Sequence, residues 1–192
     1  MTSTRLVSAV MTGAVIASLA MALPAARAAT AATPAQSQAT NAGSGTSAAS
    51  GEVAANKAAV DTMLRRWMGG DYGALQPMLA ADIEWTIAGN SLVAGTTRSR
   101  DELNRKVLGP FGARFAQSQD RFRPRTIHAV YADGDTVVAH FSAAGTTNTG
   151  HPYKNSYVWM LTMRGGKAVR VTAFFDSIAF DEFWRQNPIA AN

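Results

Sequence analysis

Residues 125–175 read RTIHAVYADGDTVVAHFSAAGTTNTGHPYKNSYVWMLTMRGGKAVRVTAFF, and this stretch decides the fold class. Hydrophobic and polar residues alternate through most of it, and a period of two is typical of β-strands. The sequences Asp133-Gly134 and Gly165-Gly166 separate neighbouring runs and predict hairpin turns. We therefore expect antiparallel strands at residues 125–131, 136–144, 153–163 and 167–175.

The rest of the domain is mostly helical in pattern. Apolar residues at helical spacing and turn residues predict helices at 53–68, 72–79, 99–108 and 178–185, and alternation predicts a strand at 83–87. Ser99 and Glu102 have the spacing of a capping box, and Gly109-Pro110 is expected to end the helix that they open. Helices that precede most of an antiparallel sheet predict an α+β fold, in which a curved antiparallel or mixed sheet wraps around about three N-terminal helices and encloses a cone-shaped space.

The first residues have the composition of a targeting segment. Residues 1–28 combine a basic start, an apolar run and the sequence Ala26-Arg27-Ala28, which is typical of a cleavable secretory signal peptide rather than a retained membrane anchor. Residues 29–51 contain no aromatic or large aliphatic side chain, so they are predicted to be a disordered linker before a domain at 52–192. We expect export by the general secretory route to the periplasm or the outside of the cell, with no membrane anchor after cleavage.

Composition and charge limit the chemistry. The chain of 192 residues has no Cys, which excludes disulfide frameworks, thiol nucleophiles and Cys-ligated metals. His128, His140 and His151 lack the spacing of metal ligands, so neither a metal nor a cofactor is predicted. Between Arg98 and Arg125 there are eight basic and three acidic residues. This excess is interpreted as a solvated surface, with an anionic ligand, an envelope lipid or a nucleic acid as alternatives, and nucleic acid is not expected for an exported protein.

Five short motifs occur along the domain in a characteristic order. They are WMGGD (67–71), LAADIEW (79–85), DGDTVV (133–138), GHPYKN (150–155) and FFD (174–176). Their order and spacing resemble those of the SnoaL-like, nuclear transport factor 2-like superfamily. The resemblance implies a cystatin-like roll with a deep hydrophobic pocket and, in many members, a homodimer formed through the outer face of the sheet. Members of the superfamily carry out many reactions, so the fold does not give the function.

The resemblance allows the catalytic residues of ketosteroid isomerases to be compared with this chain. Their oxyanion-hole tyrosine, base aspartate and neutral aspartic acid correspond to positions at or near Met63, Ile87 and Trp159. Proton abstraction beside a carbonyl needs a base and an oxyanion donor. Steroid isomerisation is therefore not expected.

Limonene epoxide hydrolases are similar to the last third of the chain. Their arginine and aspartate pair falls at about Ala139 and Phe141, and their water-positioning tyrosine and asparagine fall on Trp85 and Ile87. Only Asp176 matches one of their catalytic aspartates. SnoaL-type polyketide cyclases use a single pocket aspartate as acid and base, which is one interpretation of Asp176. The other is a cap for the last helix, because strand alternation places Asp176 opposite the inward face.

These comparisons favour a binding module that holds a small hydrophobic or aromatic molecule, as a homodimer. One alternative is a lyase, isomerase, cyclase or hydrolase that uses Asp176 alone, and another is an interaction module that uses the outer sheet face, where His140 is predicted to lie. The predicted pocket residues are Met63, Trp67, Trp85, Ile87, Ala139, Phe141, Tyr157, Trp159 and Phe175.

Overall fold

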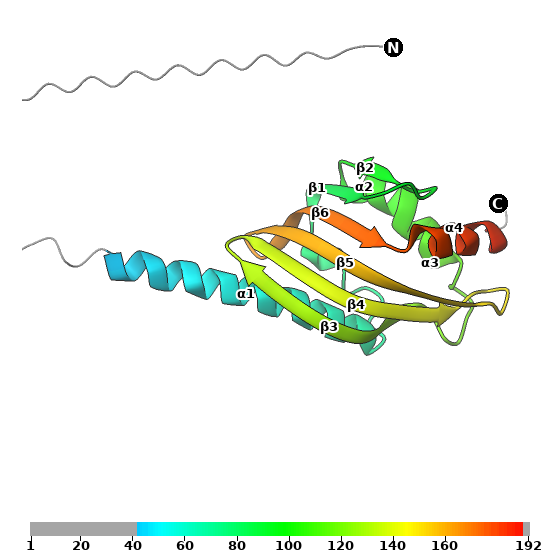
Figure 1. Ribbon diagram of the computed structural model, residues 1–192, viewed down its shortest axis with the longest axis horizontal. Helices are drawn as coiled ribbons and strands as arrows, with labels where there is room; N and C mark the ends of the chain where they lie inside the picture. Colours follow the sequence, from blue (N-terminus) through cyan, green and yellow to red (C-terminus); the bar gives the residue numbers. More distant parts are fainter. Residues whose placement is uncertain (1–41, 190–192) are drawn as a thin grey trace, which may run out of the picture. The chain divides into compact units, whose positions relative to one another are not determined.

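The computed structural model describes residues 42–189, which form one six-stranded sheet and the helices around it (Figure 1). The predicted signal peptide and the first part of the predicted linker lie outside these residues. The strands are β1 (Leu79–Ile87), β2 (Gly95–Thr97), β3 (Arg123–Asp133), β4 (Thr136–Thr146), β5 (Pro152–Arg164) and β6 (Lys167–Phe175). The helices are α1 (Ala42–Met68), α2 (Arg100–Leu103), α3 (Gly109–Ala113) and α4 (Ser177–Gln186), with a 3₁₀ turn η1 (Gln76–Met78) and a π-helical turn η2 (Asn104–Leu108).

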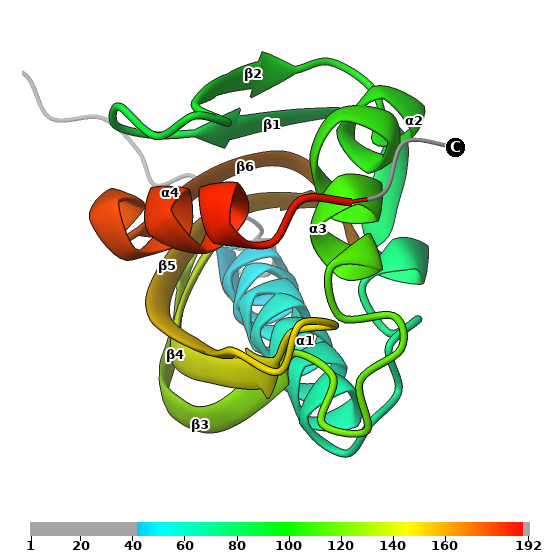
Figure 2. The same ribbon diagram turned by 90° about the vertical axis from the view of Figure 1, so that its right-hand side faces the viewer.

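The sheet runs in the order β2-β1-β6-β5-β4-β3. Strands β3 to β6 form the predicted antiparallel meander, β1 pairs with β6 in parallel, and β2 pairs with β1 antiparallel. The register places Phe141 opposite Tyr157 and Trp159 opposite Ala173, so that large side chains gather on one face. Figure 2 shows this sheet curled around α1. The predicted α+β class with a curved, mixed sheet is confirmed.

Helix α1 begins earlier than the sequence predicted. It starts at Ala42 instead of Val53, so part of the predicted linker is helical. Residues 42–51 contain three alanines but also three glycines and four Ser or Thr residues, so helix propensity did not predict this extension. Residues 48–52 are exposed, whereas Val60 and Leu64 are fully buried in the core. The part of α1 near the sheet is therefore fixed by packing.

The predicted helix at 72–79 is wrong. This segment is a turn in which the Asp71 carboxylate accepts a hydrogen bond from the Gly73 N–H at 3.1 Å, followed by η1 and then by β1. Leu79 is fully buried and pairs with Ala168 of β6, so tertiary packing outweighs local propensity here. The short strand β2 was not predicted.

The helix that Ser99 opens continues past its predicted end. The Ser99 hydroxyl accepts the Glu102 N–H at 3.0 Å, as a capping residue does, and α2 leads through η2 into α3. Gly109-Pro110 does not end the helix, because Pro110 lies in the first turn of α3, where a missing N–H costs little. The Gly109 N–H donates to the Asn104 carbonyl, which is the i→i+5 bond of a π-turn. A Cβ atom on Gly109 would lie 2.7 Å from that carbonyl oxygen.

None of the helices in the described part of the chain combines the length and the hydrophobicity that crossing a bilayer requires.

Candidate functional site

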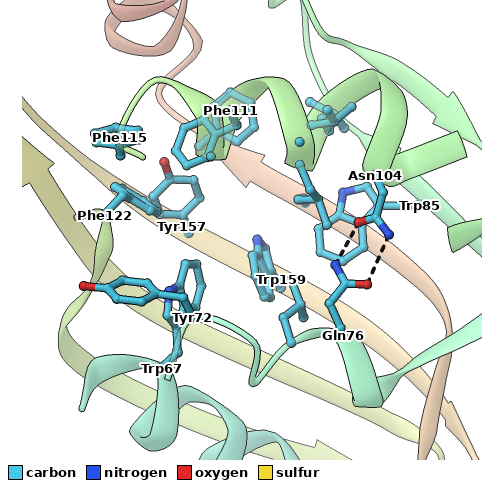
Figure 3. A pocket seen from close by; sticks show the side chains of 18 of the residues that line it. Trp67, Tyr72, Gln76, Trp85, Asn104, Phe111, Phe115, Phe122, Tyr157 and Trp159 are labelled. Atoms are coloured by element: carbon cyan, nitrogen blue, oxygen red, sulfur yellow. Dashed lines mark hydrogen bonds between the residues drawn. The ribbon is translucent and has the colours of Figure 1, made fainter. Parts of the chain in front are cut away.

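A cavity of about 340 Å³ lies on the concave face of the sheet (Figure 3). Its sheet wall is formed by inward-facing residues of β1, β4, β5 and β6, namely Trp85, Ile87, Phe141, Tyr157, Trp159, Ala173 and Phe175. Trp67, at the end of α1, closes one side. The sequence placed Trp67 and all of these sheet residues except Ala173 in the pocket.

Two predicted pocket residues do not line the cavity. Met63 is 3% exposed and Ala139 is fully buried, and both belong to the core between α1 and the sheet. Strand and helix periodicity identify the inward face correctly but not the depth along it. Trp67 lies one turn beyond Met63 on α1 and reaches the cavity.

The opposite wall consists of residues that the sequence did not place in the pocket. They are Tyr72 and Leu75 from the turn after α1, Gln76 from η1, and Asn104, Val107, Leu108, Phe111 and Phe115. The last five come from the helical segment formed by α2, η2 and α3, or from the residues just after it. Asn104, Val107, Leu108 and Phe111 have the spacing of one helix face, which is a signal that the supposed stop at Gly109 concealed.

Three indole rings form the centre of the aromatic wall. The Trp159 ring stacks with Trp67 at 6.1 Å and meets the edge of Trp85 at 5.1 Å and of Phe141 at 5.0 Å between centroids. Trp85 and Trp159 are buried residues, but their indole nitrogens are not among the enclosed side-chain atoms without a hydrogen-bond partner in residues 42–189, which are Asn56 Nδ2 and Arg114 Nε. Figure 3 shows the Trp159 nitrogen on the side of its ring that points toward the helical segment. These rings therefore offer flat apolar surface together with indole N–H groups.

A pair of amide side chains connects two segments of the wall that faces the sheet. Gln76 Nε2 donates to Asn104 Oδ1 at 2.8 Å, and Asn104 Nδ2 donates to Gln76 Oε1 at 3.1 Å (Figure 3). Gln76 and Asn104 are half-buried and Tyr72 is exposed, whereas Trp85 and Trp159 on the sheet are buried. The cavity therefore opens to solvent between the turn after α1 and the helical segment, and the amide pair bridges this opening.

A buried hydrogen-bond chain ends at Tyr157. Asn155 Nδ2 donates to the Tyr153 hydroxyl at 3.0 Å, and that hydroxyl lies 3.0 Å from the Tyr157 hydroxyl. The Tyr153 oxygen accepts from Asn155, and either of the two phenol hydroxyls can donate to the other. Burial raises the pKa of Tyr153 to about 12 and the pKa of Tyr157 well above its ordinary value. Both phenols are therefore hydrogen-bond donors at neutral pH, and neither is a base.

Asp176 does not line this cavity. It is exposed at the end of β6, and its Oδ1 accepts the N–H groups of Ile178 at 2.9 Å and Ala179 at 3.2 Å. The carboxylate is thus the N-cap of α4, which is the second of the two roles that the sequence left open. Its backbone is held by Asn155, which accepts the Asp176 N–H at 3.1 Å.

His140 lies on the outer face of the sheet, as predicted. Its ring centroid is 4.5 Å from that of His128, and the two imidazoles contact the hydroxyls of Ser156 and Ser142. In the described part of the chain, no three side chains of His, Asp or Glu come together as a metal site would require.

The model of one protein family matches the chain. It describes the SnoaL-like domain and covers residues 60–171, which contain β1, most of β6 and nearly all of the cavity wall. The chain belongs to the SnoaL-like domain family. The predicted resemblance is confirmed. No curated protein matches the sequence.

Solved structures share the fold of this SnoaL-like domain. A protein from a soil-derived mobile gene cassette is 20% identical with a TM-score of 0.57, and the match covers 70% of this chain and 99% of that one. A Xanthomonas campestris protein of unknown function with a cystatin-like fold is 27% identical, with a TM-score of 0.53 and coverages of 67% and 97%. An NTF2-like protein from Burkholderia thailandensis is 25% identical, with a TM-score of 0.52 and coverages of 67% and 95%.

The cavity wall of this SnoaL-like domain is mostly apolar, with a few polar side chains. Among the described residues that line it, none is Asp, Glu, His or Lys. Its polar groups are amides, indoles, phenols and the Arg121 guanidinium. General acid–base catalysis near neutral pH works best with a group that titrates there. The wall instead offers hydrogen-bond donors around a large aromatic surface.

Proposed function

We propose that this SnoaL-like domain binds a small, flat, hydrophobic or aromatic molecule in the cavity and holds it without acid–base chemistry. The observation that carries the proposal is the wall itself, in which Trp67, Trp85 and Trp159 face a space that includes no carboxylate or imidazole among the described lining residues. A volume of about 340 Å³ is at the small end of ligand pockets, and it suits a molecule of a few rings.

Tryptophan fluorescence provides the direct test, because the three cavity tryptophans are three of four in the chain. The fourth, Trp184, packs under the Arg114 guanidinium at 3.7 Å and does not line the cavity. Titration with N-phenyl-1-naphthylamine, a neutral flat probe, is expected to quench the tryptophans and enhance the probe's emission. The Trp184→Phe variant removes most of the signal from outside the cavity and should retain the response.

Ala173→Leu tests whether the probe occupies the cavity. Ala173 is 2% exposed and its side chain is part of the wall, so a larger residue fills part of the space. The variant is expected to weaken probe binding at least tenfold. Ala58→Leu makes the same change on the exposed face of α1 and should leave binding unchanged. Equal binding by the wild type and a folded Ala173→Leu variant would contradict the proposal.

The outer sheet face supports a second proposal, a homodimer. Tyr131 is 68% exposed, and Met160 and Phe174 are each 43% exposed. The register carries this face across β3 to β6, since Val138 pairs with both Tyr131 and Met160. Sedimentation of the wild type should give twice the protomer mass, and Met160→Glu should give monomers. A monomeric wild type would contradict the dimer.

Export also remains a proposal. If the signal peptide ends at Ala28, the intact mass of protein from the cell envelope should correspond to a chain that begins at Ala29. A full-length mass in the membrane fraction would support a retained anchor instead.

A further inference from the structure

Arg121 is a cation in the cavity wall without an anionic partner. It is half-buried, and in the described part of the chain no carboxylate lies within ion-pair distance of it. Its guanidinium lies over the Tyr72 ring, 4.2 Å from the centroid. A cation–π contact of this kind compensates only partly for lost hydration.

The nearest acids along the chain are engaged with other arginines. Asp120 pairs with Arg125 at 2.5 Å and with Arg123 at 3.6 Å. Asp71, beside Tyr72, accepts from Arg66 at 2.6 Å. The charge of Arg121 is therefore the one in this group that no carboxylate balances within residues 42–189.

Tyr72 adds a second donor at the same end of the cavity. Its hydroxyl oxygen accepts a hydrogen bond from Arg123 Nη1 at 3.2 Å, so its own hydrogen is free to be donated. Tyr72 is 36% exposed, which places this end at the opening. Trp67 connects it with the apolar interior, because the Trp67 ring lies 5.8 Å from Phe122 and 6.1 Å from Trp159.

We propose that Arg121 and Tyr72 bind the anionic group of the ligand, so that the molecule held in the cavity is an aromatic or other apolar organic anion. Its ring system lies against Trp67 and Trp159, and its carboxylate or sulfonate lies at the opening. A planar guanidinium suits such a group, because it donates two parallel hydrogen bonds to a carboxylate. The inference rests on the proposed function and adds the ligand's chemical class to it.

Two probes with the same ring system test the inference. N-phenyl-1-naphthylamine is neutral, and 8-anilino-1-naphthalenesulfonate adds one sulfonate to the same skeleton. Arg121→Gln is expected to weaken sulfonate binding at least tenfold and to change binding of the neutral probe less than twofold. Tyr72→Phe should weaken sulfonate binding by a smaller factor. In competition, 2-naphthoate should displace the sulfonate probe better than 2-naphthamide does.

Arg105→Gln is the matched control, because it removes the same charge from an exposed residue beside Asn104 that does not line the cavity and has no carboxylate within ion-pair distance in residues 42–189. If Arg105→Gln weakens binding of the sulfonate probe as much as Arg121→Gln does, the effect comes from the general electrostatic field of the protein and the inference is wrong. If both probes bind and Arg121→Gln leaves their affinity ratio unchanged, the inference is wrong while the proposed function stands. If neither probe binds, both fail. Thermal unfolding of each variant verifies that it is folded.

Discussion

Gly109→Ala should destabilise the protein, although the same change at an ordinary helix position stabilises it. Gly109 has φ −63°, which any residue adopts, and alanine is favoured over glycine in a helix by about 1 kcal/mol. Here the new Cβ would lie 2.7 Å from the Asn104 carbonyl oxygen, closer than the 3.0 Å that such atoms keep. Overpacking costs about 1–3 kcal/mol, so we expect a net loss of about 1 kcal/mol. In a domain of this size the loss corresponds to about 2–4 °C in Tm.

Gly112→Ala is the control, because it lies in the same helix and a Cβ there meets nothing within 4 Å. It should stabilise the protein by about 0.5–1 kcal/mol. Urea unfolding of both variants, followed by circular dichroism, gives the two free energies. If Gly109→Ala is as stabilising as Gly112→Ala, the π-turn does not require glycine and the reasoning is refuted. A loss at Gly109 accompanied by altered probe binding would connect the π-turn to Asn104 and the amide pair.

Three further predictions concern individual side chains. Gln76→Leu should lower the free energy of unfolding in urea by about 1–2 kcal/mol, because it leaves the Asn104 amide unpaired. Adding Asn104→Leu should restore part of this loss. If the losses of the two substitutions add instead, this account is contradicted. Asp176→Ala should lower the free energy of unfolding by about 1 kcal/mol, because it removes the N-cap of α4. It should leave probe binding unchanged. Loss of probe binding in a folded variant would show that Asp176 acts in the cavity. Since the pKa of Tyr153 rises from 10.0 to about 12 on folding, the contribution of this shift to stability is complete below pH 10 and is lost as the pH rises toward 12. The free energy of unfolding in urea should therefore decline less steeply between pH 10 and about 12 for Tyr153→Phe than for the wild type. An equal decline in both proteins would contradict the shift.

The predicted strands match the structure well where turns and alternation agree. Strand β6 has the predicted bounds, because Gly165 and Gly166 have the positive φ that the preceding turn needs and the alternating run behind them has one buried face. The helix predicted at 72–79 is wrong because residues 72–78 form a turn and η1, and only Leu79 joins a strand, through pairing with distant β6 that no local pattern shows.

The candidate site was predicted on one side only. Strand parity identifies inward residues such as Trp85 and Trp159, but the wall that faces them depends on how the helical segment bends across the sheet. That bend is produced by the π-turn at Asn104, a conformation with no simple sequence pattern. The role of Asp176 depended on the position at which β6 ends, since one residue beyond the strand is the capping position of α4.

The parallel pairing of β1 with β6 has a consequence for the order of folding. Trp85 belongs to the first strand that is synthesised, whereas Val171, its neighbour in the sheet, belongs to the last. Strand β1 therefore cannot form its hydrogen bonds to β6, and the cavity wall cannot be completed, until nearly the whole domain has been synthesised. Contacts between such distant segments slow folding, because the loop between them must be closed first. A chain of this topology therefore keeps the aromatic wall of its cavity incomplete until late in synthesis.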